Sequence, residues 1–209
     1  MIVVKKFTVE MAHIVRNCSS RKCSHSFHGH SYTVEVGIRA DGVDNAQMIV
    51  DFGLLKGAIK DFIESMDHTM MICKYDNPEI IDFYKKYNER LIIVPFNPTA
   101  EMLAVFIGMG VDYILGSTIF NNMEHPLFVD HVRVHETATG SAIYEGNKDN
   151  NLIQPHYRKF TDVEYSEGIR NEWGSDLKKI WENQRSFIRT PKVEQQINLG
   201  YINHLSDKD

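Results

Sequence analysis

The sequence feature that most constrains the fold is the pair His28 and His30, which opens a segment of alternating character. Apolar side chains continue on the same parity as the two histidines as far as Ile38, and the positions between them are mainly polar. In a β-strand, residues two apart point to the same face of the sheet. The pattern therefore predicts a strand over residues 28–40, with both imidazoles on its apolar face.

A third histidine falls in the same phase on the preceding segment. Phe7, Val9 and Met11 alternate with polar residues, and His13 is the next position of that apolar register. Imidazoles on an apolar face are costly unless a partner satisfies them. One interpretation is hydrogen-bonded core histidines, or chance in a chain with 10 histidines. We favour a metal site, because three histidines on neighbouring strands match the ligand set of catalytic zinc, which keeps one open position.

Composition sets the broad class of the protein. With 209 residues, 43% hydrophobic and 24% charged, the chain has the size of one domain, or of one domain with an appendage. The net charge of −5 argues against non-specific nucleic-acid binding, which needs a basic surface. The three cysteines suit no disulfide framework, so a reducing, cytoplasmic location is expected. No stretch predicts a membrane span or a leader segment, so no membrane partner is expected.

The remaining patterns predict an α+β fold with the order strand, strand, helix, helix, strand, strand. Further strands are expected over residues 2–13, 128–136 and 141–145, with strand character over 47–51, and amphipathic helices over about 52–66 and 98–115. Asn97 is the expected cap of the second helix. Residues 78–87 and 91–94 fit a short helix and a short strand. Glu136 either lies on the apolar face, where a ligand with paired N–H donors would satisfy it, or follows the strand and is solvated.

The composition changes after Gly146. Residues 147–151 form a polar linker, and residues 147–209 are expected to be a C-terminal extension of unknown role. Within the extension, one helix is predicted from Ser175 to Ile188, because its apolar residues form a stripe at helical spacing.

Five motifs, in order across residues 1–145, resemble the 6-pyruvoyltetrahydropterin synthase / 6-carboxytetrahydropterin synthase family. They are Glu10-Met11-Ala12-His13, His28-Gly29-His30-Ser31-Tyr32, Ile49-Val50-Asp51-Phe52 with Leu55-Lys56, Met66-Asp67-His68, and Asn97-Pro98-Thr99-Ala100-Glu101 with His135-Glu136-Thr137. The resemblance implies a T-fold (tunnelling fold) for residues 1–146, which is an antiparallel sheet with two helices on one face. It also implies a homo-oligomer in which trimers stack into hexamers, with active sites at the interfaces.

The resemblance also implies a role for each matching residue. The implied zinc (Zn2+) ligands are His13, His28 and His30, and the implied dyad for proton transfer is Asp67 and His68. The residues implied to bind substrate are Glu136, Thr99 and Glu101. Glu136 would anchor the guanidine-like edge of a small-molecule pterin, and the other two would line the pocket, partly across a subunit boundary. The implied substrate is 7,8-dihydroneopterin triphosphate.

The chain departs from the family pattern at the catalytic cysteine. The usual 6-carboxytetrahydropterin synthase places three residues between this cysteine and the His-Gly-His motif, whereas Cys23 has four and Ser24 stands at the expected position. Cys23 is the candidate base, with Cys18, His25 or a water as alternatives. Arg16, Arg21 and Lys22 in the same loop are candidates for contacting the triphosphate, or are simply exposed surface charges.

The leading interpretation is therefore a zinc-dependent lyase that forms 6-carboxytetrahydropterin, on the route to 7-deazaguanine compounds such as preQ0 and queuosine. One alternative is a 6-pyruvoyltetrahydropterin synthase, or an enzyme of folate synthesis that cleaves the pterin side chain. Another is a T-fold protein that binds a pterin or purine without turnover. The identity of the product distinguishes the enzymes from one another, and measured turnover distinguishes them from the binding protein.

Overall fold

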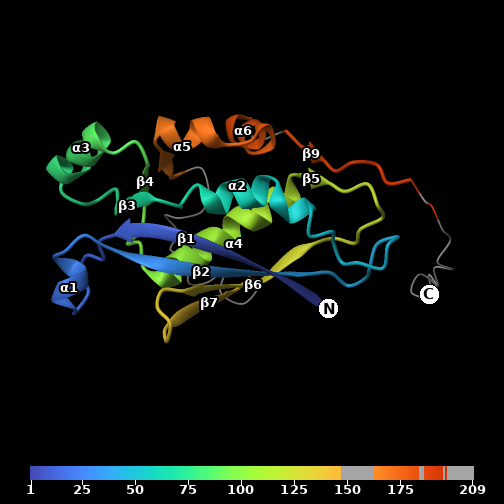
Figure 1. Ribbon diagram of the computed structural model, residues 1–209, viewed down its shortest axis with the longest axis horizontal. Helices are drawn as coiled ribbons and strands as arrows, with labels where there is room; N and C mark the ends of the chain where they lie inside the picture. The colour runs from blue at the N-terminus through green and yellow to red at the C-terminus, as the bar shows by residue number, and fades with distance from the viewer. Residues whose placement is uncertain (147–161, 184–185, 195, 197–209) are drawn as a thin grey trace.

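Two long antiparallel strands, β1 (Ile2–His13) and β2 (His28–Arg39), set the two faces of the sheet. They pair over their whole length, from Ile2 opposite Arg39 to His13 opposite His28. In the computed structural model, which describes residues 1–146, 162–183, 186–194 and 196, this pair lies at the centre of a seven-stranded sheet (Figure 1). The alternation seen in the sequence is preserved, because the apolar positions of both strands are buried and form part of the core.

The strand order of the sheet is β7-β6-β2-β1-β3-β4-β8. The flanking strands are β3 (Thr69–Cys73), β4 (Leu91–Val94), β6 (Phe128–His135), β7 (Ser141–Glu145) and β8 (Glu164–Tyr165). The pairings β1–β3 and β3–β4 are parallel, and the other four are antiparallel. The predicted α+β fold with a mostly antiparallel sheet is confirmed, and β3 is an addition to the predicted elements.

Helices cover the apolar face of the sheet (Figure 1). They are the short 3-10 helix η1 (Leu54–Lys56), α2 (Ala58–Glu64) and α4 (Ala100–Gly116). The helix predicted over 52–66 is divided in two, since glycines at 53 and 57 flank η1, and glycine has a low helix propensity. Residues 47–51 form no strand, which corrects the expected hairpin extension. Two further helices, α1 (Arg21–Ser24) and α3 (Pro78–Tyr87), lie at one end of the sheet.

The start of α4 differs from the prediction in a way that affects the site. Its N-cap is Thr99, whose side chain accepts a hydrogen bond from the Met102 N–H at 3.3 Å. Asn97, the expected cap, instead binds the backbone of Arg16 in both directions, accepting from its N–H at 3.0 Å and donating to its C=O at 2.5 Å. The helix therefore begins later than expected, and Asn97 joins this segment to the loop that follows β1.

The described part of the C-terminal extension packs on the same core. It contains β8, α5 (Glu167–Glu172), α6 (Ser175–Glu182) and β9 (Ile188–Arg189), and β9 pairs with β5 (Thr118–Ile119). The helix predicted over 175–188 ends at Glu182, and α5 precedes it. The predicted linker, residues 147–151, lies outside the described residues, and the division of the chain at residue 146 stays a prediction.

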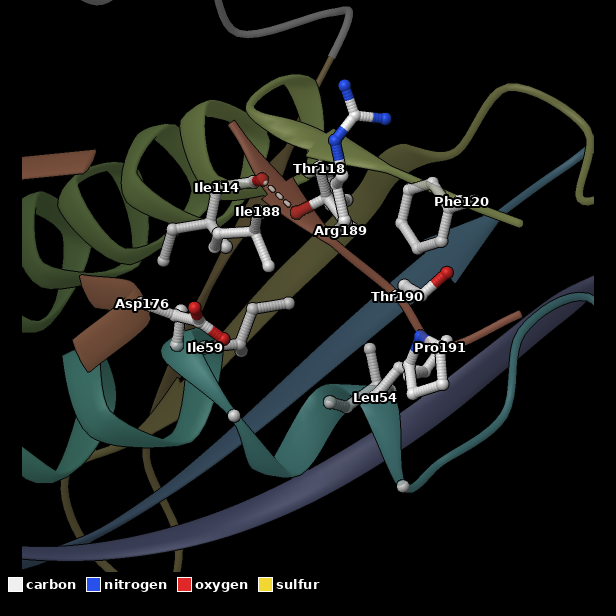
Figure 2. Close-up of a pocket in the computed structure, with 15 residues that line it drawn as sticks. Leu54, Ile59, Ile114, Thr118, Phe120, Asp176, Ile188, Arg189, Thr190 and Pro191 are labelled. Atoms are coloured by element: carbon white, nitrogen blue, oxygen red, sulfur yellow. Dashed lines mark hydrogen bonds between the residues drawn. The ribbon is translucent and has the colours of Figure 1, made fainter. Parts of the chain in front are cut away.

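The extension closes one side of the helical layer. A cavity of about 160 Å³ lies between η1, α2, α4 and β9, and Figure 2 shows Leu54, Ile59, Ile114 and Ile188 around it. The deeper tail side chains, including Ile169, Leu177 and Ile180, are fully buried in the main core. Among the described residues, no helix has the length and apolar character needed to cross a membrane.

Candidate metal centre and active site

Three imidazoles converge where β1 ends and β2 begins. The candidate ligand atoms of His13, His28 and His30 all lie within 4.8 Å of one another. His13 is fully buried, and the other two are partly exposed. The cross-strand pairing explains this arrangement, because His13 lies directly opposite His28, and His30 follows on the same face of β2.

Backbone carbonyls fix the protons on two of these rings. His13 Nδ1 lies 2.7 Å from the Pro98 carbonyl oxygen, and His28 Nδ1 lies 3.0 Å from the Ser26 carbonyl oxygen. A carbonyl only accepts, so each Nδ1 carries the proton and donates it. In the neutral form of such a ring, Nε2 keeps its lone pair, and the Nε2 atoms of His13 and His28 face each other at 3.1 Å.

This donor set fits a tetrahedral metal ion. Two facing lone pairs repel unless a proton or a cation lies between them. Imidazole nitrogens bound to one zinc at 2.0–2.1 Å in tetrahedral geometry are about 3.3 Å apart, close to the separation of the His13 and His28 Nε2 atoms. Burial lowers the pKa of His13, which favours the neutral form that binds metal.

Tyr32 and Glu136 complete the inner wall of the cluster. The Tyr32 hydroxyl donates to Glu136 Oε1 at 3.4 Å, and the same oxygen lies 3.8 Å from the Nε2 atoms of His13 and His30. Burial, followed by the nearby Glu136 charge, raises the pKa of Tyr32, so its hydroxyl stays protonated. β6 ends at His135, so Glu136 follows the strand, yet its carboxylate, 32% exposed, still points at the histidines.

The loop between β1 and β2 carries the candidate thiol. Cys23 lies in α1, is half-buried and is a free cysteine, as are Cys18 and Cys73. Ser24, at the position expected for the catalytic cysteine, is buried. Its hydroxyl is engaged by the Ser20 carbonyl oxygen and by His25 Nδ1, each at 2.8 Å. Ser24 is therefore a structural residue of the loop.

Arg16 is also occupied by structural contacts. Its guanidinium donates to both carboxylate oxygens of Asp76, at 2.8 and 3.0 Å, and to the Ser24 carbonyl at 2.9 Å. These contacts tie the cysteine loop to the segment before α3, so Arg16 is not a free phosphate ligand. Arg21 and Lys22 are exposed, which leaves them as the candidates for a triphosphate.

Two other predicted residues lie at the start of α4. Thr99 caps the helix, and Glu101 is exposed in its first turn. They follow Pro98 directly, whose carbonyl orients His13. The sequence analysis did not predict these roles of Pro98 and Ser26. Every residue type has a backbone carbonyl, so the sequence cannot show which carbonyl orients a histidine.

The predicted proton-transfer pair lies elsewhere on the chain. His68 Nδ1 is 2.7 Å from Asp67 Oδ2, and Asp67 Oδ1 accepts the Glu10 N–H at 2.7 Å. His68 is largely exposed and lines a depression together with Thr8 and Glu10. These two β1 residues alternate with the buried Val9 and Met11, so the depression lies on the sheet face opposite the histidine cluster.

Within the described part of one chain, His68 and His30 both line one depression, but the two groups make no direct polar contact. Among the described residues, no hydrogen bond or ion pair joins Asp67 or His68 to His13, His28 or His30. The structure thus assembles the histidines, Tyr32 and Glu136 into one cluster, and presents the Asp–His pair on another surface.

Comparison with known proteins agrees with the motifs. A family model described as 6-pyruvoyl tetrahydropterin synthase matches residues 2–147. A Helicobacter pylori protein named 6-carboxy-5,6,7,8-tetrahydropterin synthase is 36% identical over 83% of this chain and 86% of its own length. A protein of the same name from Aquifex aeolicus is 36% identical over 57% of this chain and 74% of its own.

A solved structure supports the fold. An uncharacterized protein from Wolinella succinogenes superposes with a TM-score of 0.53 at 19% identity, covering 69% of this chain and 97% of that one. At this identity the likeness bears on the fold alone.

Proposed function

Because the chain is an enzyme of the 6-pyruvoyl tetrahydropterin synthase family, we propose that it is a zinc-dependent lyase that converts 7,8-dihydroneopterin triphosphate to 6-carboxytetrahydropterin. The observation that carries the choice of product is the shared name of the curated relatives, which cover most of this chain. The observation that supports zinc is the pair of Nε2 atoms facing each other between His13 and His28.

Each part of the histidine cluster would have its own role in this reaction. His13, His28 and His30 would hold the metal through Nε2, with two rings oriented by carbonyl oxygens. A bound zinc ion would supply Lewis acidity toward the hydroxyls of the substrate side chain. Glu136 would accept paired N–H donors from the pterin edge, since a carboxylate recognises such a fork in bidentate fashion.

Proton transfer would fall to the remaining polar groups. The Cys23 thiol would remove or return a proton at the carbon next to the ring, because it is the cysteine of the loop nearest in sequence to His28. The Asp67 carboxylate would hold the His68 ring through Nδ1, leaving Nε2 for proton exchange. Thr99 and Glu101 would line the pocket from the start of α4.

The separation of the two groups supports an oligomeric active site. Asp67 and His68 lie on the face opposite the histidines, and neither contacts that cluster within the described chain. A second copy of the chain can bring its Asp–His pair to the cluster of the first. We therefore propose a homo-oligomer, built from trimers that stack into a hexamer, with the sites between subunits.

The cysteines indicate the cellular compartment that we propose. The three cysteines are free, which suits a reducing compartment, and we place the protein in the cytoplasm. 6-Carboxytetrahydropterin would feed the synthesis of 7-deazaguanine compounds such as preQ0 and queuosine.

Product analysis tests the function directly. Zinc-loaded protein is incubated with 7,8-dihydroneopterin triphosphate, and the products are identified by mass spectrometry. We expect 6-carboxytetrahydropterin together with acetaldehyde and triphosphate. A 6-pyruvoyl or hydroxymethyl product would move the enzyme to biopterin or folate chemistry. A pterin that binds without turnover would make the chain a binding protein.

A further inference from the structure

The turn between α2 and β3, which carries Asp67 and His68, has a strained backbone. His68 has a φ of 54°, in the left-handed region that non-glycine residues rarely occupy. Such a conformation costs on the order of 1 kcal/mol and persists only where the surroundings impose it. Local contacts supply part of this restraint, because the His68 N–H donates to the Glu10 carbonyl at 2.6 Å. The rest comes from residues far along the chain.

Arg90, the residue directly before β4, donates hydrogen bonds to the backbone of this turn. Its Nε donates to the Asp67 carbonyl at 2.9 Å, and Nη2 lies 3.4 Å from the Glu64 carbonyl oxygen. The side chain is only 21% exposed. Its Nη1 is paired with Glu172, the last residue of α5 in the C-terminal extension. The extension therefore contacts the Arg90 guanidinium, which in turn donates a hydrogen bond to the backbone of Asp67.

The next residue of the extension reaches the other end of the turn. Trp173 Nε1 donates to Ser65 Oγ at 2.6 Å, and both residues are buried. The Ser65 hydroxyl donates a hydrogen bond to the Asp61 carbonyl at 2.7 Å, and the Gly174 N–H donates to Asp61 Oδ2 at 3.1 Å. Trp173 and Gly174 thus contact the end of α2, and Glu172 contacts Arg90, which binds the Asp67 carbonyl.

An aromatic cluster fixes the tail segment itself. The ring of Trp173 lies 5.1 Å from Tyr165 and 5.2 Å from Trp181, centroid to centroid. Tyr165 belongs to β8, which pairs with β4 only a few residues after Arg90. Both ends of the connection are therefore anchored in packed structure, so a displacement of Trp173 would be transmitted to Ser65.

We propose that the segment Glu172–Gly174 positions the Asp67–His68 pair, acting through Arg90 and Ser65. This inference rests on the proposed function of that pair in proton transfer. It gives the C-terminal extension a role in the reaction although none of its described residues contacts the histidine cluster. A misplacement of about 1 Å in a reacting group lowers a rate by up to about 100-fold, so the effect is measurable.

Kinetics of two single variants test the proposal. Trp173→Phe keeps an aromatic six-membered ring but removes the donor to Ser65, and Glu172→Gln removes the charge facing Arg90. The matched control is Glu167→Gln, an exposed carboxylate in the first turn of the same helix. We expect kcat to fall at least about 10-fold in both variants, with KM within about twofold, zinc content unchanged and the control equal to the parent. Parent-like kcat in both variants overturns the proposal, as does a rise in KM alone.

A double-variant comparison distinguishes positioning from general damage. In a His68→Ala background the pair is already broken, so adding Trp173→Phe should leave the residual rate unchanged. If Trp173→Phe lowers the residual rate by the same factor as in the parent, the tail acts on the whole protein and not on the pair.

Hydrogen exchange provides a readout that needs no turnover. We expect the Asp67 and His68 amides to exchange at least about fivefold faster in Glu172→Gln and Trp173→Phe, while the amides of the β1–β2 ladder are unaffected. Unchanged exchange at the turn overturns the positioning role, whatever the substrate. If the parent shows no turnover but the turn loosens as expected, the proposed function fails and the structural link stands. Should Trp173→Phe not fold, Glu172→Gln alone decides, because its side chain is exposed.

Discussion

His28 shows how a single residue can decide whether the cluster binds metal. Its Nδ1 is held by the Ser26 carbonyl, and its Nε2 faces that of His13. Replacing His28 or His30 with alanine leaves two imidazoles, fewer than the three protein ligands of a catalytic zinc site. We expect bound zinc, measured by plasma mass spectrometry after dialysis, to fall from about one per chain to near zero. His125→Ala, an exposed histidine outside the cluster, should keep its metal. Full zinc content in both cluster variants would refute the assignment.

The cysteines differ in their expected contribution to turnover. Cys23 lies in α1 of the loop that precedes His28, and Cys18 lies farther away in sequence, with its thiol bound to the Ser20 carbonyl at 3.3 Å. We expect Cys23→Ala to lower kcat by about 100-fold or more, the scale of a lost general base, while Cys18→Ala keeps the parent rate. Steady-state assays of both variants, checked for equal zinc content, make the comparison. Equal rates in both would show that neither thiol is the base.

Asp76 links residue chemistry to the pH dependence of stability. Burial alone would raise its pKa, but hydrogen bonds from Arg16 and the Asn77 N–H outweigh burial and lower it. A carboxyl with a lowered folded-state pKa stabilises the fold above its unfolded value of about 3.9, and this contribution is lost as pH falls through the folded-state pKa. We expect Asp76→Asn to lower the free energy of unfolding by about 2 kcal/mol at pH 7.

Urea unfolding of the parent and the Asp76→Asn variant at pH 7 and pH 3 measures this contribution. The difference between the two proteins should shrink at pH 3, where the parent carboxyl begins to protonate. Asp82→Asn, an exposed carboxylate on α3, should match the parent at both pH values. A difference of the same size at pH 3 and pH 7 would contradict the linkage.

At the scale of elements, α5 approaches the segment before β4 so closely that only glycine fits at position 168. A Cβ there would lie 2.6 Å from the Glu89 carbonyl oxygen, which already accepts a hydrogen bond from Ser166 Oγ at 2.5 Å. We expect Gly168→Ala to lower the free energy of unfolding by about 1–3 kcal/mol, because backbone must move. Gly116→Ala, at the end of α4 with no atom within 4 Å of its Cβ, should be neutral or slightly stabilising. Denaturant midpoints of the two variants decide; equal midpoints would mean that α5 moves away at no cost.

Elements whose pattern follows from local sequence were predictable. β1, α3, β4 and β7 begin and end where alternation, capping or apolar runs place them. β3 was not predicted, because four of its five residues are buried and therefore show no alternation. The helix predicted over 52–66 is longer than the observed α2, since the apolar spacing continues across Gly53 and Gly57, which interrupt the helical backbone.

For the site, the positions of the histidines could be predicted from the sequence, but their hydrogen-bond partners could not. Alternation on two strands is enough to bring His13, His28 and His30 to one face, and the structure brings their rings together. The partners that orient the rings are backbone carbonyls contributed by distant segments, which no residue pattern records. The contacts of Glu172 with Arg90 and of Trp173 with Ser65 likewise depend on tertiary packing across more than 80 positions.

At the scale of the whole molecule, the two faces of the sheet carry different parts of the proposed chemistry. The histidine cluster lies on the helix-covered face, and Asp67 and His68 line a depression on the opposite face. A single chain cannot turn one face toward the other, because the strands between them are continuous and paired. We therefore expect a complete site to need two chains.

Mixing two inactive variants tests this requirement. His28→Ala lacks a proposed metal ligand, His68→Ala lacks the exposed imidazole, and each homo-oligomer should have little activity. In hetero-oligomers formed by co-expression, some interfaces combine an intact cluster with an intact Asp–His pair. For random mixing in equal amounts, we expect about a quarter of the parent kcat to return, because one interface in four then carries both intact halves. The control mixture, His28→Ala with His30→Ala, should stay inactive, since both lesions fall in the same half. Activity no greater than the sum of the separate variants would show that the site is built within one chain.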